Sequence, residues 1–354
     1  MLLSIGDQVK PGSYRLHSTF RRAVNYEHRG RLISVVDEAI GPGPLNIVLR
    51  SLADGGRARL SSARRGLPQT TGRRAEDSRA LPAGLPLRVI AHTVLFAAHR
   101  YHFTSRQRYH STIELKAVDL HRLQHNLSAL GESLKETAPP KSLAFLLDGK
   151  RRKNFRAGFE RAFAEQITRG VYQVFQGRLL PGIRQLKGCG LGLTPAGDDF
   201  IAGFLIALHL LQRLDGQDCQ STADAVFRAA QGDNIFSNTF LDLARQGLLF
   251  GRMKDLLLAL VAGSEGSVRR AARKLFDIGE TSGADLATGL FMTLQFEQNT
   301  LPPSVPRPSR SGDTSGIVPA RGSARIRALA YPAFQGAELE FDSSDYPQEA
   351  VEEG

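Results

Sequence analysis

The chain has 354 residues, of which 42% are hydrophobic, so it can bury a core and form two domains, or one domain with an appendage. Its two cysteines exclude a disulfide framework and favour a reduced, cytoplasmic compartment. The formal net charge of +11 would suit a polyanionic partner. Much of it, however, is arginine in one loop-like segment, so we do not expect a nucleic-acid partner.

The amino-terminal part alternates short β-type runs with turns. Residues 1–17 lack the apolar core of a signal peptide, so no secretion is expected. The runs are RLISVVD (31–37), LNIVLRSL (45–52), LRVIAHTVLF (87–96) and STIELKAV (111–118), and a turn-rich GPGP precedes the second of them. This pattern predicts strands of an antiparallel or barrel-like sheet. We assign them to a β-rich domain, residues 1–118.

An arginine-rich segment interrupts these strands. Between Arg50 and Arg79 there are eight arginines and three acids among Gly, Ser, Pro and Thr. Such a composition cannot bury much apolar surface, which predicts a flexible basic insertion at about residues 51–80.

From about Asp119 the period becomes helical. Leu120, Leu123, Leu127 and Leu130 fall on one stripe, and residues 152–176 continue in helical style. The longest apolar run, residues 200–211, is too short for a membrane helix and suits a buried one. These features predict a mainly helical domain, residues 119–298, and an α+β fold class.

The last part of the chain has a different composition. Residues 299–354 begin with Pro, Ser, Gly and Arg, and from Glu338 onward they contain seven acids and no base. We predict a disordered tail there.

Six of the nine histidines fall between His92 and His125. The pairs His99/His102 and His121/His125 have spacings that metals accept, but no acid or cysteine stands at a matching spacing. We therefore interpret them as ordinary surface or core histidines.

The stretch GCGLGLTPAGDDFIAG, residues 188–203, contains four glycines, Thr-Pro and two aspartates within twelve residues. Thr194 suits an N-cap and Pro195 the first helical position. The glycines let backbone amides approach an anion at the positive end of the helix dipole. The spacing does not match the P-loop pattern, which gives no support to nucleoside triphosphate binding. The alternative is a well-capped core helix.

Asp198 and Asp199 lie just inside this predicted helix. They would stabilise the helix dipole or, in a functional interpretation, bind a cation such as Mg²⁺, orient a substrate amide, or transfer a proton. No cofactor follows from the residues themselves, and Mg²⁺ is the candidate that a carboxylate pair suggests.

A second stretch, GETSGADLATG at residues 279–289, repeats the pattern with Thr281 as the predicted cap. Asp285 follows Thr281 by four residues, as Asp198 follows Thr194, and Gly289 follows Asp285 by four, as Gly203 follows Asp199. The counterpart of Asp285 therefore stays open. Aspartate and glycine share a helix face, so the glycine makes room for a second helix or for a ligand. Our hypothesis is that both helix starts converge on one pocket, with Glu280 as a further acid.

Between the two stretches, Ser237, Asn238 and Thr239 stand before a predicted amphipathic helix. They would cap that helix or line the same pocket.

Three segments, GLGLTPAGDDFIAGF, SNTFLDLARQG and IGETSGADLATGL, resemble successive motifs of the AllH family, a subunit of oxamate carbamoyltransferase. YRLHSTFRRAVNY, GRLISVVD and GPGPLNIVL resemble the opening of that family, so the resemblance covers roughly residues 12–295. It implies a subunit that acts with two partners, one akin to succinyl-CoA synthetase, in anaerobic allantoin and purine catabolism. The implied reaction converts oxalurate and phosphate into oxamate and carbamoyl phosphate.

The motifs and the resemblance together give a set of candidate site residues for small anionic substrates. We expect catalytic roles for Asp198, Asp199 and Asp285. The expected substrate-binding residues are Gly190, Gly192, Thr194, Gly197, Ser237, Asn238, Thr281, Ser282 and Gly283. Amides from Gly190 to Gly197 would hold phosphate, and Cys189 is a conceivable nucleophile if the helix dipole lowers its pKa. A non-catalytic scaffold or regulatory subunit is the alternative.

Overall fold

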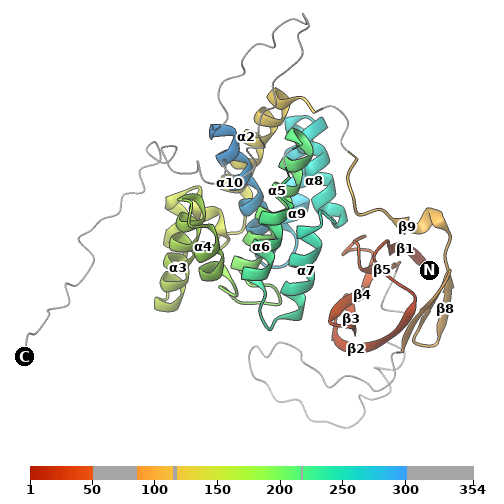
Figure 1. The fold of residues 1–354 in the computed structure, drawn as a ribbon. Helices are drawn as coiled ribbons and strands as arrows, with labels where there is room; N and C mark the ends of the chain where they lie inside the picture. Colours follow the sequence, from red (N-terminus) through yellow and green to blue (C-terminus); the bar gives the residue numbers. More distant parts are fainter. Residues whose placement is uncertain (51–85, 115–117, 217, 301–354) are drawn as a thin grey trace, which may run out of the picture.

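The computed structural model describes residues 1–50, 86–114, 118–216 and 218–300 (Figure 1). Strands form the amino-terminal part and helices the rest, which confirms the predicted α+β class. The predicted insertion at about 51–80 lies outside the described residues, and so do residues 301–354 of the predicted tail. The division into domains at residue 118 stays a prediction.

Among the described residues the sheet has nine strands in the order β8-β7-β6-β2-β3-β4-β5-β1-β9, and it curls around its own core. Pairing is antiparallel except for β4 with β5 and β1 with β9. The strands are β1 (Leu2–Gly6), β2 (Gly12–Phe20), β3 (Ala23–His28), β4 (Arg31–Asp37), β5 (Asn46–Leu49), β6 (Leu87–Ile90), β7 (Thr93–Phe96), β8 (His99–His102) and β9 (Arg108–Tyr109).

Two hairpins show how local sequence shapes this sheet. β3 and β4 are joined by Arg29 and Gly30, both at positive φ, the backbone that a two-residue hairpin turn with the twist of its strands requires. The run at 87–96 is two strands with a turn at Ala91 and His92, so it forms a hairpin.

The prediction of a strand at 111–118 is wrong for the residues that the structure describes. Residues 111–114 form no strand, and residues 115–117 lie outside the described residues. The amide and hydroxyl of Ser111 both donate to the Asp7 carboxylate, at 3.0 and 2.9 Å, and its carbonyl accepts from the amide of Leu249. These bonds use the backbone groups that a sheet ladder would need.

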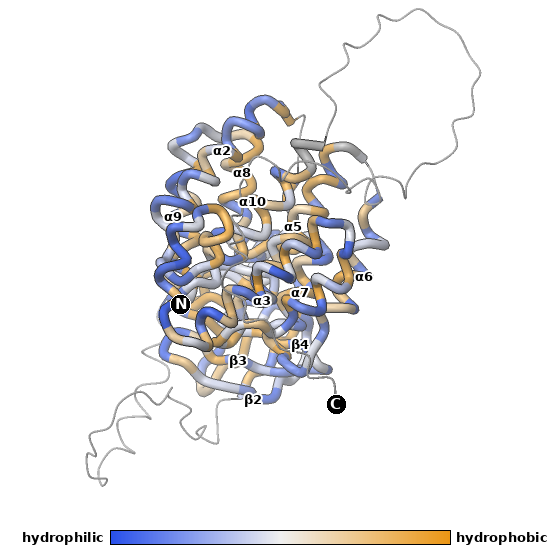
Figure 2. Tube along the Cα trace, turned by 90° about the vertical axis from the view of Figure 1, so that its left-hand side faces the viewer, coloured by the Kyte–Doolittle hydropathy of each residue, from blue (hydrophilic) through white to orange (hydrophobic). Residues whose placement is uncertain are grey.

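The helical region packs around α5 and α10, and hydrophobic stretches fill its interior (orange in Figure 2). Its helices are α2 (Leu120–Thr137), α3 (Gly158–Phe175), α4 (Leu179–Leu186), α5 (Ala196–Asp215), α6 (Gln220–Ala230), α7 (Ile235–Arg245), α8 (Gly251–Ala262), α9 (Glu265–Phe276) and α10 (Ser282–Thr300). The described residues also form short 3-10 helices, η2 (Ser105–Gln107), η3 (Leu143–Leu146) and η4 (Gly149–Asn154). No helix in the described residues is long and apolar enough to span a membrane.

Helix α2 begins close to the predicted place. The Asp119 carboxylate accepts hydrogen bonds from the amides of His121 and Arg122, which satisfies two of the free donors of the first turn. Leu123 and Leu127 are buried as predicted, but Leu120 is 59% exposed because it lies in the first turn, beyond the edge of the core.

Helix α7 connects the helices with the sheet. Arg31 of β4 forms an ion pair with Asp242 at 2.8 Å, and Leu243 of α7 is buried among the strand residues. Tyr109 of β9 donates its hydroxyl hydrogen to the Leu249 carbonyl at 3.0 Å. The helices that carry the two glycine and aspartate motifs pack in the helical core, and α7 links that core to the sheet.

Candidate functional site

The start of α5 is one residue later than predicted. The helix begins at Ala196, and Pro195 occupies the N-cap with an extended backbone, ψ 146°. Thr194 therefore does not cap the helix. Its hydroxyl instead donates to Oδ2 of Asp199 at 3.2 Å, so its role is in the side-chain contacts of the site.

Asp198 and Gly197 hold the loop that precedes α5. Oδ1 of the buried Asp198 accepts the amide hydrogen of Gly188 at 2.7 Å. The Gly197 amide donates to the Cys189 carbonyl at 2.8 Å, and a Cβ on Gly197 would overlap the Leu186 carbonyl at the end of α4. The Gly197 amide is thus already bonded, and its lack of a side chain allows close packing.

The glycine loop, residues 188–194, lies on the surface. Gly188, Gly190 and Gly192 have φ of 66°, 123° and 108°, values that residues with side chains rarely adopt. Within the described residues the amides of Gly190 and Gly192 donate no hydrogen bond. Leu191 between them is 88% exposed. The loop therefore offers free backbone donors to a ligand.

The structure resolves which aspartates correspond. Helices α5 and α10 cross where each has a glycine: a Cβ on Gly203 would overlap the Leu286 carbonyl, and a Cβ on Gly289 would overlap that of Phe200. These reciprocal contacts relate GDDFIAG (197–203) to GADLATG (283–289). They pair Asp199 with Asp285 and fill the space beside both glycines with the second helix.

The starts of α5 and α10 meet at this pair of carboxylates. The hydroxyls of Thr194 and Ser282 are 3.4 Å apart, and the Asp199 carboxylate accepts hydrogen bonds from both. Oδ1 of Asp285 accepts from the Leu143 amide at 2.6 Å, and Thr281 also donates to this carboxylate. The two helix starts thus converge as hypothesised, but on a buried contact, and a shared pocket stays a prediction.

The Asp199–Asp285 pair lies in the protein interior, with exposures of 2% and 0%. Burial, and then the charge of Asp285, raises the pKa of Asp199 well above its usual value. Burial also raises the pKa of Asp285 to about 7. Two buried carboxylates of which one raises the pKa of the other do not both ionise readily, and their raised pKa values favour a proton on the pair near neutral pH. Within the described residues Oδ2 of Asp285 has no hydrogen-bond partner.

The sequence between the two helix starts also contributes to the site. Ser237, Asn238 and Thr239 lie inside the first turns of α7, because Asn234 is its N-cap and accepts from the amides of Phe236 and Ser237. The expectation that the trio precedes the helix is therefore wrong. Asn234, which sequence reasoning missed although Asn is a preferred cap, also donates to the Leu193 carbonyl at 2.7 Å.

The trio itself does not touch the carboxylate pair in any described contact. Asn238 exchanges two hydrogen bonds with Gly232, and Thr239 accepts the amide hydrogen of Leu32. Oγ of Ser237 is buried and has no partner within the described residues. Through Asn234, the start of α7 nevertheless lies against the glycine loop.

The segment just described, from the end of α4 through α10, is also where the chain is similar to a known family. Residues 186–294 match the model of the family oxamate carbamoyltransferase subunit AllH. The match includes both glycine and aspartate motifs and the α7 segment, and it supports the family that the motifs indicate. The searches of curated proteins and of solved structures found no match.

Within this AllH-like segment, Cys189 lacks the properties of an activated nucleophile. It is buried, and burial, together with the nearby Asp198 charge, raises its pKa to about 11. The expectation that the helix dipole lowers the pKa of Cys189 is thus wrong, because desolvation disfavours the thiolate more strongly. Glu280, expected as a further acid, is exposed.

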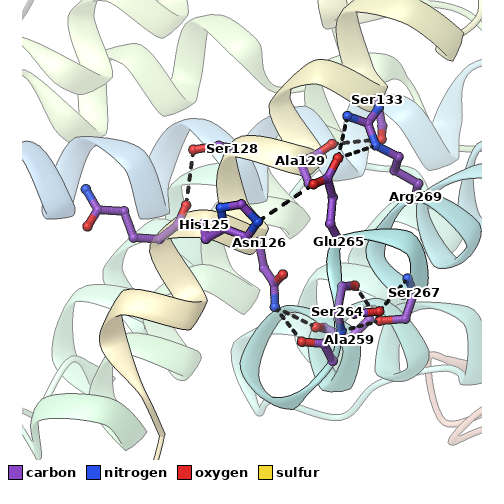
Figure 3. A network of polar contacts seen from close by, with 12 residues as sticks. His125, Asn126, Ser128, Ala129, Ser133, Ala259, Ser264, Glu265, Ser267 and Arg269 are labelled. Atoms are coloured by element: carbon purple, nitrogen blue, oxygen red, sulfur yellow. Dashed lines mark hydrogen bonds and ion pairs between the residues drawn. The ribbon is translucent and has the colours of Figure 1, made fainter.

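The two histidine pairs noted in the sequence lie outside the AllH-like segment. His125 faces Glu265, with Nε2 and Oε2 3.7 Å apart, in the contact between α2 and α9 (Figure 3). Next to it, Asn126 donates to the Ala259, Leu260 and Gly263 carbonyls at the end of α8. Across the described ranges, no three His, Cys, Asp or Glu side chains are arranged to hold a metal.

Proposed function

We propose that the chain is a subunit of an oxamate carbamoyltransferase-type complex, which moves a carbamoyl group between oxalurate or oxamate and phosphate or carbamoyl phosphate. The complex would serve allantoin degradation in the cytoplasm. The family match supports the subunit role. The observation that carries the reaction is the buried Asp199–Asp285 pair, in which one oxygen has no partner among the described residues.

The chemistry of the pair suits this reaction. A phosphate oxygen attacks the carbamoyl carbon of oxalurate, the bond from that carbon to the oxamate nitrogen breaks, and the nitrogen takes up a proton as it leaves. An acid with a pKa of about 7 both donates and recovers a proton near neutral pH. The ionised partner accepts hydrogen bonds from carbamoyl or amide N–H groups.

The glycine loop gives the site its means of contact with substrate. Thr194, at the end of the loop, contacts Asp199, and Asn234 holds the loop at Leu193. In our proposal this end of the loop moves aside, the amides of Gly190 and Gly192 bind the anionic substrate, and the carboxylates reach its nitrogen. A Mg²⁺ ion between the carboxylates would need further ligands from water or substrate.

The burial of both carboxylates favours a second candidate. Side chains with 2% and 0% exposure also suit a purely structural pair, in a subunit that assembles or regulates the complex without performing its chemistry. The two candidates differ in what an uncharged, equally shaped side chain would do.

The test measures turnover of oxalurate and phosphate by the full chain with its partner subunits, with and without Mg²⁺. Asp199→Asn and Asp285→Asn should each lower turnover by roughly 100-fold or more, while the complex still assembles on a sizing column. Asp277→Asn changes an exposed aspartate at the end of α9 and serves as the matched control. Normal turnover in both variants would assign the chain to the scaffold role.

A further inference from the structure

A pocket of about 560 Å³ lies between α4 and α6, outside the carboxylate pair. Its lining consists of Leu180, Arg184, Lys187, Ala225, Arg228 and Ala229. Arg184 and Arg228 belong to the last turns of the two helices, and Lys187 directly follows α4. The lining thus has three cations, no acid and an apolar floor.

The cations of this pocket differ from Arg245 and Arg269 in their ion pairing. Arg245 pairs with Asp224 and Asp242, and Arg269 pairs with Glu265 and Glu136. Within the described residues, no ion pair or hydrogen bond engages the charged groups of the three pocket cations. A cation in the last turn of a helix complements the helix dipole, which explains Arg184 or Arg228 singly. All three side chains are exposed, and Asp224 lies near enough to Arg228 to feel its charge, but no acid is among the residues that line the pocket. Three cations around one concavity without a lining acid suit an anion.

The pocket adjoins the glycine loop through the chain itself. Lys187 directly precedes Gly188, whose amide Asp198 holds. The Lys187 side chain extends to Gly232, where a Cβ would lie 3.1 Å from its Cε. Gly232 in turn is bonded to Asn238. The segment that begins at Gly188 and the segment around Asn238 therefore meet beside the basic pocket as well as at the glycine loop.

We propose that this pocket binds the phosphate group of a small anion, inorganic phosphate or carbamoyl phosphate. Two guanidinium groups supply planar, paired donors that match phosphate oxygens, and the ammonium adds a third positive charge. The identity of the anion rests on the proposed function, whereas the site rests on the pocket. It assigns substrate binding to Arg184, Lys187 and Arg228.

The experiment is calorimetric titration of the full chain with inorganic phosphate and, separately, carbamoyl phosphate, at constant ionic strength set with chloride. Arg184→Gln and Arg228→Gln should each weaken binding roughly tenfold, and the double variant should abolish it. Arg169→Gln, an exposed arginine of α3 that pairs with Glu165, is the control and should bind as wild type. Binding of both anions would assign the pocket to the phosphate group, and binding of carbamoyl phosphate alone would assign it to the whole substrate.

If the wild-type chain binds neither phosphate nor carbamoyl phosphate, or if the double variant binds them unchanged, the proposed pocket is wrong. Binding of a short DNA duplex in place of phosphate, lost in the double variant, would also overturn it. The two proposals fail separately, because one is measured as turnover by the complex and the other as phosphate binding by the chain. If Asp285→Asn keeps full turnover while the double variant loses phosphate binding, the proposed reaction is wrong and the proposed pocket stands.

Discussion

The starts of α5 and α10 share a motif but differ in their surroundings. Both place a glycine against a preceding helix, an aspartate in the buried pair and a second glycine at the helix crossing. Only α5 follows a long surface loop, with three glycines at positive φ, whereas α10 follows a short turn with Gly279 alone at positive φ. The half of the motif that packs the helices is therefore symmetric, and the half that offers backbone donors is not.

The carboxylates differ in the same way. Asp199 accepts from two hydroxyls, one from each helix start, whereas Asp285 accepts from the Leu143 amide of η3 and from Thr281 and keeps Oδ2 without a partner among the described residues. Burial raises both pKa values, but the neighbours of the two groups are different. A packing motif used twice has thus acquired two chemically different carboxylates, which a site for one asymmetric substrate needs.

The largest expected effect tests the symmetric half. Gly203→Ala and Gly289→Ala each place a Cβ against a backbone carbonyl of the other helix, so each should lower the free energy of unfolding by about 3 kcal/mol or more. Gly158→Ala, at the start of α3 with open space around it, is the control and should change stability little. Thermal and urea unfolding measure this. If one variant is tolerated and the other is not, the packing is not reciprocal.

The second effect tests the carboxylate pair. Because Asp285 has a pKa of about 7 in the folded state and about 3.8 when unfolded, the folded protein binds more protons between these values. Stability should therefore fall as pH rises through this window, by up to about 4 kcal/mol. Asp285→Asn should flatten this fall, since the asparagine still accepts the Leu143 amide hydrogen. Asp277→Asn should keep the wild-type slope. Equal slopes of stability against pH in all three proteins would show that folding does not raise the pKa of Asp285.

A smaller effect concerns the loop before α5. Asn234→Ala removes the N-cap of α7 and the bond to the Leu193 carbonyl, so it should cost about 1 kcal/mol and speed hydrogen exchange in residues 188–194. Asp119→Ala removes the cap of α2, which is remote from the loop, and should have a similar cost without that faster exchange. Faster exchange in both variants would mean that the loop responds to general destabilisation.

The smallest effect reports how the loop opens. Cys189 is buried and its pKa is raised to about 11, so at pH 8 its thiol should react with a disulfide reagent much more slowly than that of the partly exposed Cys219. Each single cysteine variant identifies one of the two thiols. Asn234→Ala should speed the reaction of Cys189 alone. A fast Cys189 in the wild-type chain would contradict the closed loop.

Local features were predictable from the sequence because a few neighbouring residues determine them. The strands at 31–37 and 46–49 and the change to a helical period near Asp119 follow from alternation and periodicity, and α5 and α10 begin within one residue of their predicted starts. The same reasoning misplaced the strand at 111–114 and the cap of α7. At Ser111, groups from distant parts of the chain, Asp7 and Leu249, engage the backbone, whereas at α7 the local capping signal of Asn234 was missed.

The sequence by itself determined the α+β class, the two repeated motifs and the residue types available for chemistry. Only the tertiary structure decided that Asp199, and not Asp198, faces Asp285, that Leu143 holds Asp285, and that three cations from α4 and α6 line one pocket. The reason is physical, because burial and the charge of neighbouring groups set the pKa of a carboxylate. Both depend on two helices that are far apart in the chain and approach closely where two glycines meet.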